Sequence, residues 1–86
     1  MKELTIYSKP NCVYCTSAKD YLKQLEIPFT EVDVIDNQEK LDWLRNQGFK
    51  QLPVIFAGDD LLAPGGWSTL KTMRKHEILE RLNTDE

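Results

Sequence analysis

The chain has 86 residues, of which 41% are hydrophobic and 29% charged, and its formal net charge is -3. This length and composition predict a single domain over residues 1–86 that folds as an ordinary globular protein rather than staying disordered. The acidic balance argues against a nucleic-acid partner, which would require a basic surface. The first strand begins too close to Met1 to leave room for a signal peptide, and no apolar run could cross a bilayer, so we expect no membrane partner.

The N-terminal part of the chain predicts a strand, a helix and a second strand. Residues 4–7 are rich in β-forming types. From residue 13 to about residue 26 the apolar side chains recur at helical spacing, and the Ile27-Pro28 step ends that pattern. Residues 29–34 alternate between two faces, which is typical of a strand, and the acidic residues on one face favour the edge of a sheet.

The middle of the chain predicts a second helix followed by a hairpin. Asp36 and Glu39 form a variant of the capping box at the start of that helix. Gly48 suits the position just past its end. Residues 51–57 are typical of a strand that opens with a proline, and residues 61–63 are expected to form the short return strand.

The last part of the chain predicts one helix, from Thr69 to about Leu82, with Ser68 as its N-cap. Its inward row is expected to be Leu70, Met73, Ile78 and Leu82, and residues 83–86 are expected to form a frayed tail. The element order is then β-α-β-α-β-β-α. This order indicates an α/β fold with a four-stranded mixed sheet and three helices, in which a parallel pair joined by a right-handed crossover precedes an antiparallel hairpin.

The two cysteines of the chain, Cys12 and Cys15, stand between the first strand and the first helix. Such a C-x-x-C pair indicates redox chemistry. Cys12 is expected at the start of the helix, where unpaired backbone N–H groups and the helix dipole favour a thiolate, the nucleophile of disulfide exchange. Cys15 falls on the apolar face. We therefore expect Cys12 to be the exposed, more acidic attacker and Cys15 the shielded resolving thiol.

A zinc site and a pair of unrelated buried thiols are both less favoured for these cysteines. A zinc site needs three or four protein ligands, and the chain offers only one histidine, His76, beside the two cysteines, so we expect no metal. Two unrelated buried thiols fit poorly because Pro10-Asn11 predicts an exposed turn directly before Cys12. A lone C-x-x-C also fits a reducing compartment, which makes the cytoplasm the expected location.

Three segments carry a resemblance to a known family: residues 6–15 around the cysteines, residues 48–54, and Gly66-Trp67-Ser68. Over nearly its whole length the chain resembles glutaredoxin-type members of the thioredoxin-fold superfamily, and it is most similar to NrdH-type redoxins. The resemblance implies the thioredoxin (glutaredoxin-like) fold and dithiol–disulfide exchange with protein disulfides. It also implies electron donation to ribonucleotide reductase and thioredoxin reductase or glutathione as the reductant.

The same resemblance assigns a binding surface around the cysteines. In the family the proline matching Pro53 is cis and faces the disulfide, and the backbone of the preceding residue, here Leu52, pairs with the bound thiol partner. The expected substrate-binding residues are Lys9, Tyr14, Gln51, Leu52, Pro53, Gly65, Gly66, Trp67 and Ser68. Lys9 is expected either to favour the Cys12 thiolate or to be a solvated turn residue, and Trp67 either to line the rim of the groove or to plug the sheet.

The chain departs from the family pattern at informative positions. Tyr14 is typical of glutaredoxins, whereas NrdH-type redoxins more often carry glutamine there, and Gln51-Leu52-Pro53 replaces the usual Thr-Val-Pro. Glutaredoxins follow the glycine pair with an acidic residue that holds the amino end of glutathione, but Trp67, Ser68 and Thr69 follow Gly65-Gly66 here. Glutathione binding should therefore be weakened, because a neutral hydroxyl gives no charge-assisted hydrogen bond.

Three alternatives to the NrdH-like function stay open. The chain could be a glutathione-dependent glutaredoxin that reduces mixed disulfides. It could be a dimer that carries an iron–sulfur cluster on Cys12 thiolates and glutathione. It could also be an adaptor without catalytic activity. The favoured expectation is a monomer with no bound cofactor, for which glutathione is at most a co-substrate.

Overall fold

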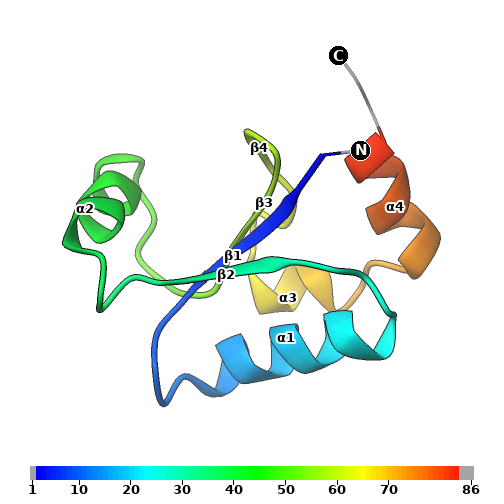
Figure 1. Ribbon diagram of the computed structural model, residues 1–86, viewed down its shortest axis with the longest axis horizontal. Coiled ribbons are helices and arrows are strands. Elements are labelled where there is room, and N and C mark those ends of the chain that lie inside the picture. The colour runs from blue at the N-terminus through cyan, green and yellow to red at the C-terminus, as the bar shows by residue number, and fades with distance from the viewer. Residues whose placement is uncertain (1, 84–86) are drawn as a thin grey trace.

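The computed structural model describes residues 2–83 and contains one four-stranded sheet with the strand order β2-β1-β3-β4 (Figure 1). β1 pairs with β2 in parallel and with β3 in antiparallel, and β3 pairs with β4 in antiparallel. The strands are β1 Leu4–Ser8, β2 Thr30–Asp33, β3 Val54–Ala57 and β4 Asp60–Leu61. The predicted parallel pair followed by a hairpin is confirmed, and the strand with the acidic face does lie at an edge.

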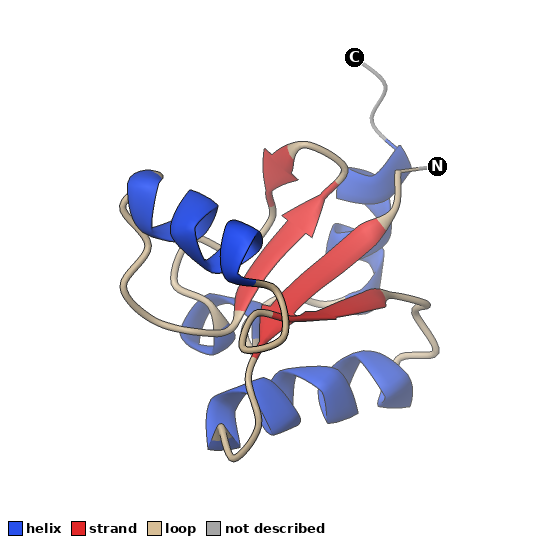
Figure 2. Cartoon of the chain, turned by 60° about the vertical axis from the view of Figure 1, so that its left-hand side comes forward, coloured by secondary structure: helices blue, strands red, loops and turns tan. Residues whose placement is uncertain are grey.

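Within residues 2–83 four helices cover this sheet, and they lie on both of its faces (Figure 2). Residues from α1, α3 and α4 pack on one face, and α2 packs on the other. The helices are α1 Val13–Gln24, α2 Gln38–Asn46, α3 Trp67–Leu70 and α4 Lys75–Asn83. None of these described helices combines the length and the apolar run needed to cross a membrane.

The two faces of the sheet follow from the alternation of side chains along each strand. Leu4 and Ile6 of β1 point to the face covered by α1, where Ala18 and Leu22 meet them. Tyr7 points to the opposite face, in the cluster that contains Leu44 of α2. Because a shift of one residue would exchange these two sets, both apolar layers fix the register of β1 between its neighbours.

The prediction of a single C-terminal helix is wrong, and with it the count of three helices. Ser68 is not an N-cap but lies inside α3, which follows Gly66. The chain then turns through residues 71–74, where the Thr72 hydroxyl donates a hydrogen bond to the Thr69 carbonyl oxygen. The Glu77 carboxylate accepts a hydrogen bond from the backbone N–H of Arg74, and this bond caps the start of α4.

The expected inward row of this region is nonetheless confirmed. Leu70, Ile78 and Leu82 are buried, and Met73 packs against the same cluster. The expected frayed tail is partly wrong, because Asn83 is the last residue of α4. Residues 84–86 lie outside the described part of the chain.

The start of α2 differs from the prediction by one residue, whereas its end agrees with it. Asn37, not Asp36, is the N-cap, and its side-chain oxygen accepts a hydrogen bond from the Lys40 N–H at 3.2 Å. Gly48 follows the C-cap with φ of 93°, and the Phe49 N–H reaches back to the Leu44 carbonyl oxygen at 3.1 Å. This is the bonding pattern of a Schellman motif, for which glycine is preferred.

Candidate functional site

The loop between β1 and α1 places the two cysteines at the start of a helix. Asn11 has φ of 61°, a conformation that asparagine tolerates better than most residues, and it turns the chain into the helix. Cys12 is the N-cap of α1, and its Sγ accepts a hydrogen bond from the Cys15 N–H at 3.3 Å. No disulfide joins the two thiols. The first cysteine thus occupies the anion-favouring end of the helix, as predicted.

The second cysteine lies beneath this position and is shielded from solvent. Cys15 is 1% exposed, whereas Cys12 is partly exposed. Burial raises the pKa of Cys15 to about 12, and its side-chain hydrogen bond with Cys12 acts in the same direction, while a backbone hydrogen bond from Lys9 opposes them. At neutral pH Cys15 is therefore a protonated thiol, and Cys12 is the sulfur that a partner can reach.

This pKa predicts a loss of stability of the reduced protein at alkaline pH. The folded state keeps the Cys15 proton up to about pH 12, whereas the unfolded chain releases it above about pH 8.5. Because the unfolded state binds fewer protons in this window, the free energy of unfolding should fall as the pH rises through it. Urea unfolding of the wild type and of Cys15→Ala across this window measures the effect. Parallel pH profiles for the two proteins would contradict it.

The segment before β3 faces the Cys12 sulfur. The Leu52-Pro53 peptide bond is cis, as the family resemblance implied, and Pro53 is buried. The Leu52 carbonyl oxygen lies 4.0 Å from Cys12 Sγ. β3 begins only at Val54, so residues 51–53 stand outside the sheet ladder rather than forming its first part as expected. The backbone of Leu52 is thus placed beside the nucleophile.

Gly66 packs closely against the backbone of this segment. It has φ of 63° and ψ of -129°, a conformation that is open to glycine and strained for other residues. A Cβ atom at this position would lie 2.7 Å from the Pro53 carbonyl oxygen. Glycine is therefore required here on two grounds, the backbone conformation and the close approach of Pro53.

Two grooves meet at the cysteine loop and share the wall formed by Tyr14 and residues 49–52. The Cys12 groove, about 590 Å³, contains Cys12 and Lys9 and runs toward α2. The Trp67 groove, about 600 Å³, contains Pro53 and runs along residues 63–68. Every predicted substrate-binding residue lines at least one groove. Cys15 lines neither, in agreement with its burial.

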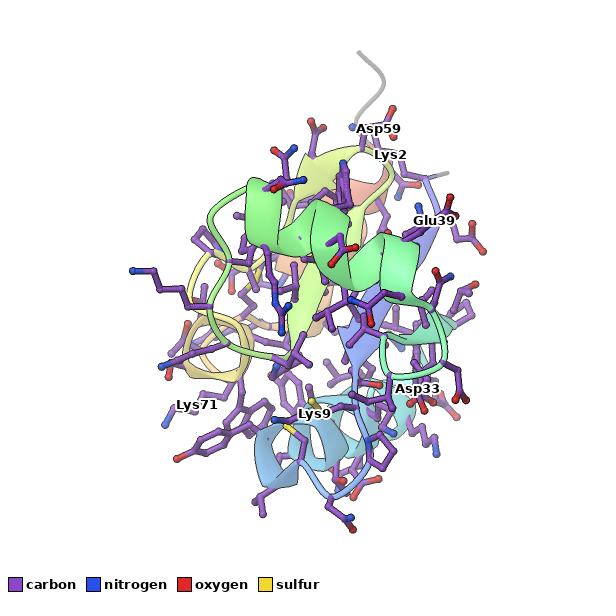
Figure 3. All side chains as sticks on the ribbon, turned by 90° about the vertical axis from the view of Figure 1, so that its left-hand side faces the viewer. Lys2, Lys9, Asp33, Glu39, Asp59 and Lys71 are labelled. Atoms are coloured by element: carbon purple, nitrogen blue, oxygen red, sulfur yellow. The ribbon has the colours of Figure 1, made fainter. Side chains whose placement is uncertain are left out.

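The charged residues that line the two grooves are all basic, although the chain as a whole is acidic. They are Lys9, Arg45, Lys50 and Lys71. Figure 3 shows the Lys9 side chain next to sulfur atoms, with Lys71 on the same side of the molecule and Lys2 and Asp59 at the opposite end. The grooves therefore favour anionic ligands, a class that includes both glutathione and acidic protein segments.

Trp67 lies both at a groove and against the buried core, and its role in binding stays a prediction. Its ring lines the Trp67 groove, and it packs edge-on against Tyr21 with ring centroids 5.7 Å apart. It also contacts the buried cluster between the sheet and α1. Tyr14, by contrast, is 62% exposed and stands between the two grooves. Trp67 thus supports one wall, and Tyr14 offers a free aromatic surface.

Several residues of the site were not predicted. Arg45 and Lys71 lie at the ends of α2 and α3, and nothing in their local sequence indicates that these helices end at one groove. Lys50 falls within the segment that carries the family resemblance, and its position directly before Gln51, a predicted substrate-binding residue, could have indicated that it lies at the site. The roles of the predicted residues stay predictions, since the structure shows where they lie and not what they bind.

A small polar network near the site joins β1, β2 and α1 through Ser8, Glu31 and Lys19. The Glu31 carboxylate accepts hydrogen bonds from Ser8 Oγ at 2.7 Å and from Lys19 Nζ at 2.8 Å. The bond from Lys19, followed by that from Ser8, lowers the pKa of Glu31, and the bond to Glu31 raises the pKa of Lys19. Both members of the pair are therefore charged at neutral pH.

Among residues 2–83 no cluster of three or more His, Cys, Asp or Glu side chains could hold a metal ion.

Comparison with known proteins agrees with this geometry. The family model Glutaredoxin matches residues 4–62. The glutaredoxin-like protein NrdH of Salmonella typhimurium is 43% identical over 56 residues, which cover 65% of this chain and 69% of the relative. The NrdH protein of Lactococcus lactis subsp. cremoris is 36% identical over 65% of this chain and 78% of its own length.

Solved structures extend the likeness to the whole chain. The NrdH-redoxin from Escherichia coli is 31% identical, with a TM-score of 0.71 over 98% of this chain and 99% of its own. Glutaredoxin from Brucella melitensis is 27% identical, with a TM-score of 0.75 over 100% of this chain and 96% of its own. With a reachable thiol at a helix start, a buried partner thiol and these relatives, the chain belongs to the glutaredoxin family and is a thiol–disulfide oxidoreductase.

Proposed function

We propose that this chain is an NrdH-like dithiol redoxin that carries electrons from thioredoxin reductase to protein disulfides, with a ribonucleotide reductase as the client. It works as a monomer in the cytoplasm and needs no bound cofactor. Two comparisons support the proposal: the relatives named NrdH, and the solved NrdH-redoxin of Escherichia coli, which is described as having a thioredoxin-like activity profile.

The observation that carries the choice of reductant is that no carboxylate is among the described residues that line the Trp67 groove. After Gly66 the groove is lined by Trp67 and the neutral Ser68, and its two charged lining residues, Lys50 and Lys71, are basic. The nearby Thr69 hydroxyl already accepts a hydrogen bond from the Gly65 N–H at 2.9 Å. The amino group of glutathione would therefore find no carboxylate among the described residues that line this groove, and it would lose the stronger, charge-assisted bond.

The mechanism uses the two thiols in sequence. The Cys12 thiolate attacks one sulfur of the client disulfide, and the other client sulfur leaves and takes up a proton. The mixed disulfide is held beside Leu52, whose backbone can pair with an extended client segment. Cys15 then attacks Cys12, which releases the second client thiol and leaves a Cys12–Cys15 disulfide. Two electrons have passed to the client, and the reductase restores both thiols.

The experiment supplies the oxidised protein with two alternative electron sources. One arm contains thioredoxin reductase with NADPH, and the other contains glutathione with glutathione reductase and NADPH. Both arms are coupled to the reduction of the same model protein disulfide. We expect turnover at least about tenfold faster with thioredoxin reductase, since a lost charge-assisted bond corresponds to about 1.5–3 kcal/mol. Faster turnover with glutathione would overturn the proposal.

A pair of variants tests the reason for that preference. Ser68 is exposed and lines the groove, so Ser68→Asp adds the missing carboxylate and Ser68→Asn adds a neutral group of the same shape. The aspartate variant should speed turnover with glutathione by about tenfold, and the asparagine variant should not. Equal effects of the two variants would show that charge at this end of the groove does not select the reductant.

A further inference from the structure

The ion pair between Lys19 of α1 and Glu31 of β2 lies on the side of α1 that carries the buried thiol. Lys19 follows Cys15 by four residues on this helix. Side chains at this spacing are neighbours on one helix face, with Cβ atoms about 5–6 Å apart. The Lys19 side chain is only 24% exposed, and its Nζ lies 2.8 Å from the Glu31 carboxylate of β2. Lys19 thus lies one helical turn after Cys15, with its charged end paired to Glu31 of β2.

The carboxylate that holds Lys19 is itself fixed. Ser8, the last residue of β1, is 1% exposed and donates its Oγ–H to Glu31 at 2.7 Å. Two donors on two different elements therefore hold Glu31 in place. The Glu31 side chain is 41% exposed, so this is a surface ion pair, and the hydrogen bond from Ser8 ties its carboxylate to β1.

Few charged or polar groups act on the Cys15 thiol. They are Cys12 and the backbone of Lys9 on the cysteine loop, and Lys19 on α1. From β2 Glu31 faces Lys19, with Asp20 and Lys23 of α1 as more distant neighbours of the pair. From β1 the neutral Ser8 hydroxyl donates a hydrogen bond to Glu31. Of the described cationic side chains, Lys19 is the one whose charge lowers the pKa of Cys15, and this is the weakest of the effects on that thiol.

We propose that Lys19 and Glu31 are positioning residues for the resolving step, in which Lys19 favours attack by Cys15 and Glu31 limits that effect. The inference rests on the dithiol mechanism given above. In this step the Cys15 S–H proton is released, a Cys12–Cys15 bond forms, and the bond between Cys12 and the client sulfur breaks. The leaving client sulfur carries away the electron pair and takes up a proton from solvent. Lys19 donates no proton in this step, and its charge stabilises the thiolate that forms on Cys15.

The proposal gives opposite signs to two changes that break the same ion pair. Lys19→Gln removes the cation beside Cys15, so the thiolate becomes harder to form and the resolving step slows. Glu31→Gln removes the anion that offsets Lys19, so the thiolate becomes easier to form and the step accelerates. If the pair served only to join α1 to β2, both variants would loosen the same contact and change the rate in the same direction.

The resolving step can be watched directly with a chromogenic aromatic disulfide such as dithiobis-nitrobenzoate. One equivalent added to the reduced protein releases a first coloured thiolate when Cys12 attacks and a second when Cys15 resolves the mixed disulfide. We expect the second phase to be about threefold slower in Lys19→Gln and about threefold faster in Glu31→Gln for each unit of pKa change. The factor is about three because the gain in thiolate is partly offset by lower nucleophilicity.

Controls separate the charge effect from a structural one. Lys19→Arg keeps the charge and should retain the wild-type second phase. Lys2 and Asp60 form an ion pair of the same 2.8 Å length elsewhere on the sheet, so Lys2→Gln and Asp60→Asn should leave this phase unchanged. In a Cys12→Ser background, the pH profile of Cys15 alkylation should move up for Lys19→Gln and down for Glu31→Gln, a readout that does not depend on turnover.

The outcomes distinguish this inference from the proposed function. Second phases that change in the same direction in both variants, or that do not change, would overturn the role of Lys19 and leave the dithiol mechanism standing. A wild-type protein that shows no second phase would overturn the dithiol mechanism and the role of Lys19 with it. The choice between thioredoxin reductase and glutathione does not enter the experiment, because neither reductant is present.

Discussion

Replacing Cys12 with serine is expected to abolish the reduction of protein disulfides, whereas replacing Cys15 with serine should trap the client. Cys12 is the partly exposed N-cap of α1 and lies beside Leu52, so it is the sulfur that can attack. A hydroxyl in its place is far too weakly acidic to replace a thiolate, and the rate should fall by about a thousandfold or more. Cys15 is buried and can act only on a sulfur already bonded to Cys12.

The measurement uses stoichiometric reduced protein and a client disulfide, with no glutathione present. Wild-type protein should release free client thiols, and Cys15→Ser should accumulate a covalent client adduct that mass spectrometry detects and dithiothreitol removes. Val13→Ser is the matched control, because Val13 lies between the cysteines, is 75% exposed and carries no thiol. It should reduce the client at a rate near that of the wild type. A Cys12→Ser protein that still forms the adduct would reverse the two roles.

The order of the strands and the position of the cysteine pair could be predicted because both depend on local patterns. Alternation along the strands and helical spacing after Cys12 determine which residues face inward, and burial of Ile6 and Leu22 follows from that alone. The cis geometry before Pro53 could not come from such a pattern. A proline is compatible with cis or trans, and the family resemblance supplied the answer.

The helix ends were less predictable because neighbouring residues can compete for one cap. Asp36 and Asn37 are both good N-caps, and the choice follows from the turn that precedes them. Asp33 Oδ1 accepts the Ile35 N–H, and the Asn37 N–H reaches the Val34 carbonyl oxygen, so the chain enters α2 one residue later than predicted. Such a turn depends on where β2 ends in the sheet.

The charges of the grooves were missed for a related reason. Arg45 lies in α2 and Lys71 directly follows α3, and the two reach the grooves only through the tertiary fold. The same holds for Lys19 of α1 and Glu31 of β2, which belong to different elements and meet in one ion pair. A sequence pattern indicates the faces of single elements, but it does not indicate which exposed side chains of different elements will converge.

Replacing Gly66 with alanine should destabilise the fold and reduce disulfide exchange together, more than the same change at another glycine of positive φ. A backbone held in a region open mainly to glycine costs about 1–3 kcal/mol for other residues. At Gly66 the new Cβ would also lie 2.7 Å from the Pro53 carbonyl oxygen, so Pro53 or the start of α3 has to move. We expect a total loss of about 2–6 kcal/mol in the free energy of unfolding, since forced overpacking adds about 1–3 kcal/mol.

Gly48→Ala separates these two contributions. Gly48 has φ of 93°, but a Cβ there would meet no atom within 4 Å, so this variant carries the backbone strain without the collision. Urea unfolding should show the larger loss for Gly66→Ala. At a temperature where both variants are folded, Gly66→Ala should react with iodoacetamide at Cys12 almost normally, yet reduce protein disulfides several-fold more slowly, because displaced Leu52 and Pro53 no longer present the client to an intact thiol. Equal losses of stability and exchange in the two variants would mean that the contact between Gly66 and Pro53 does not shape the site.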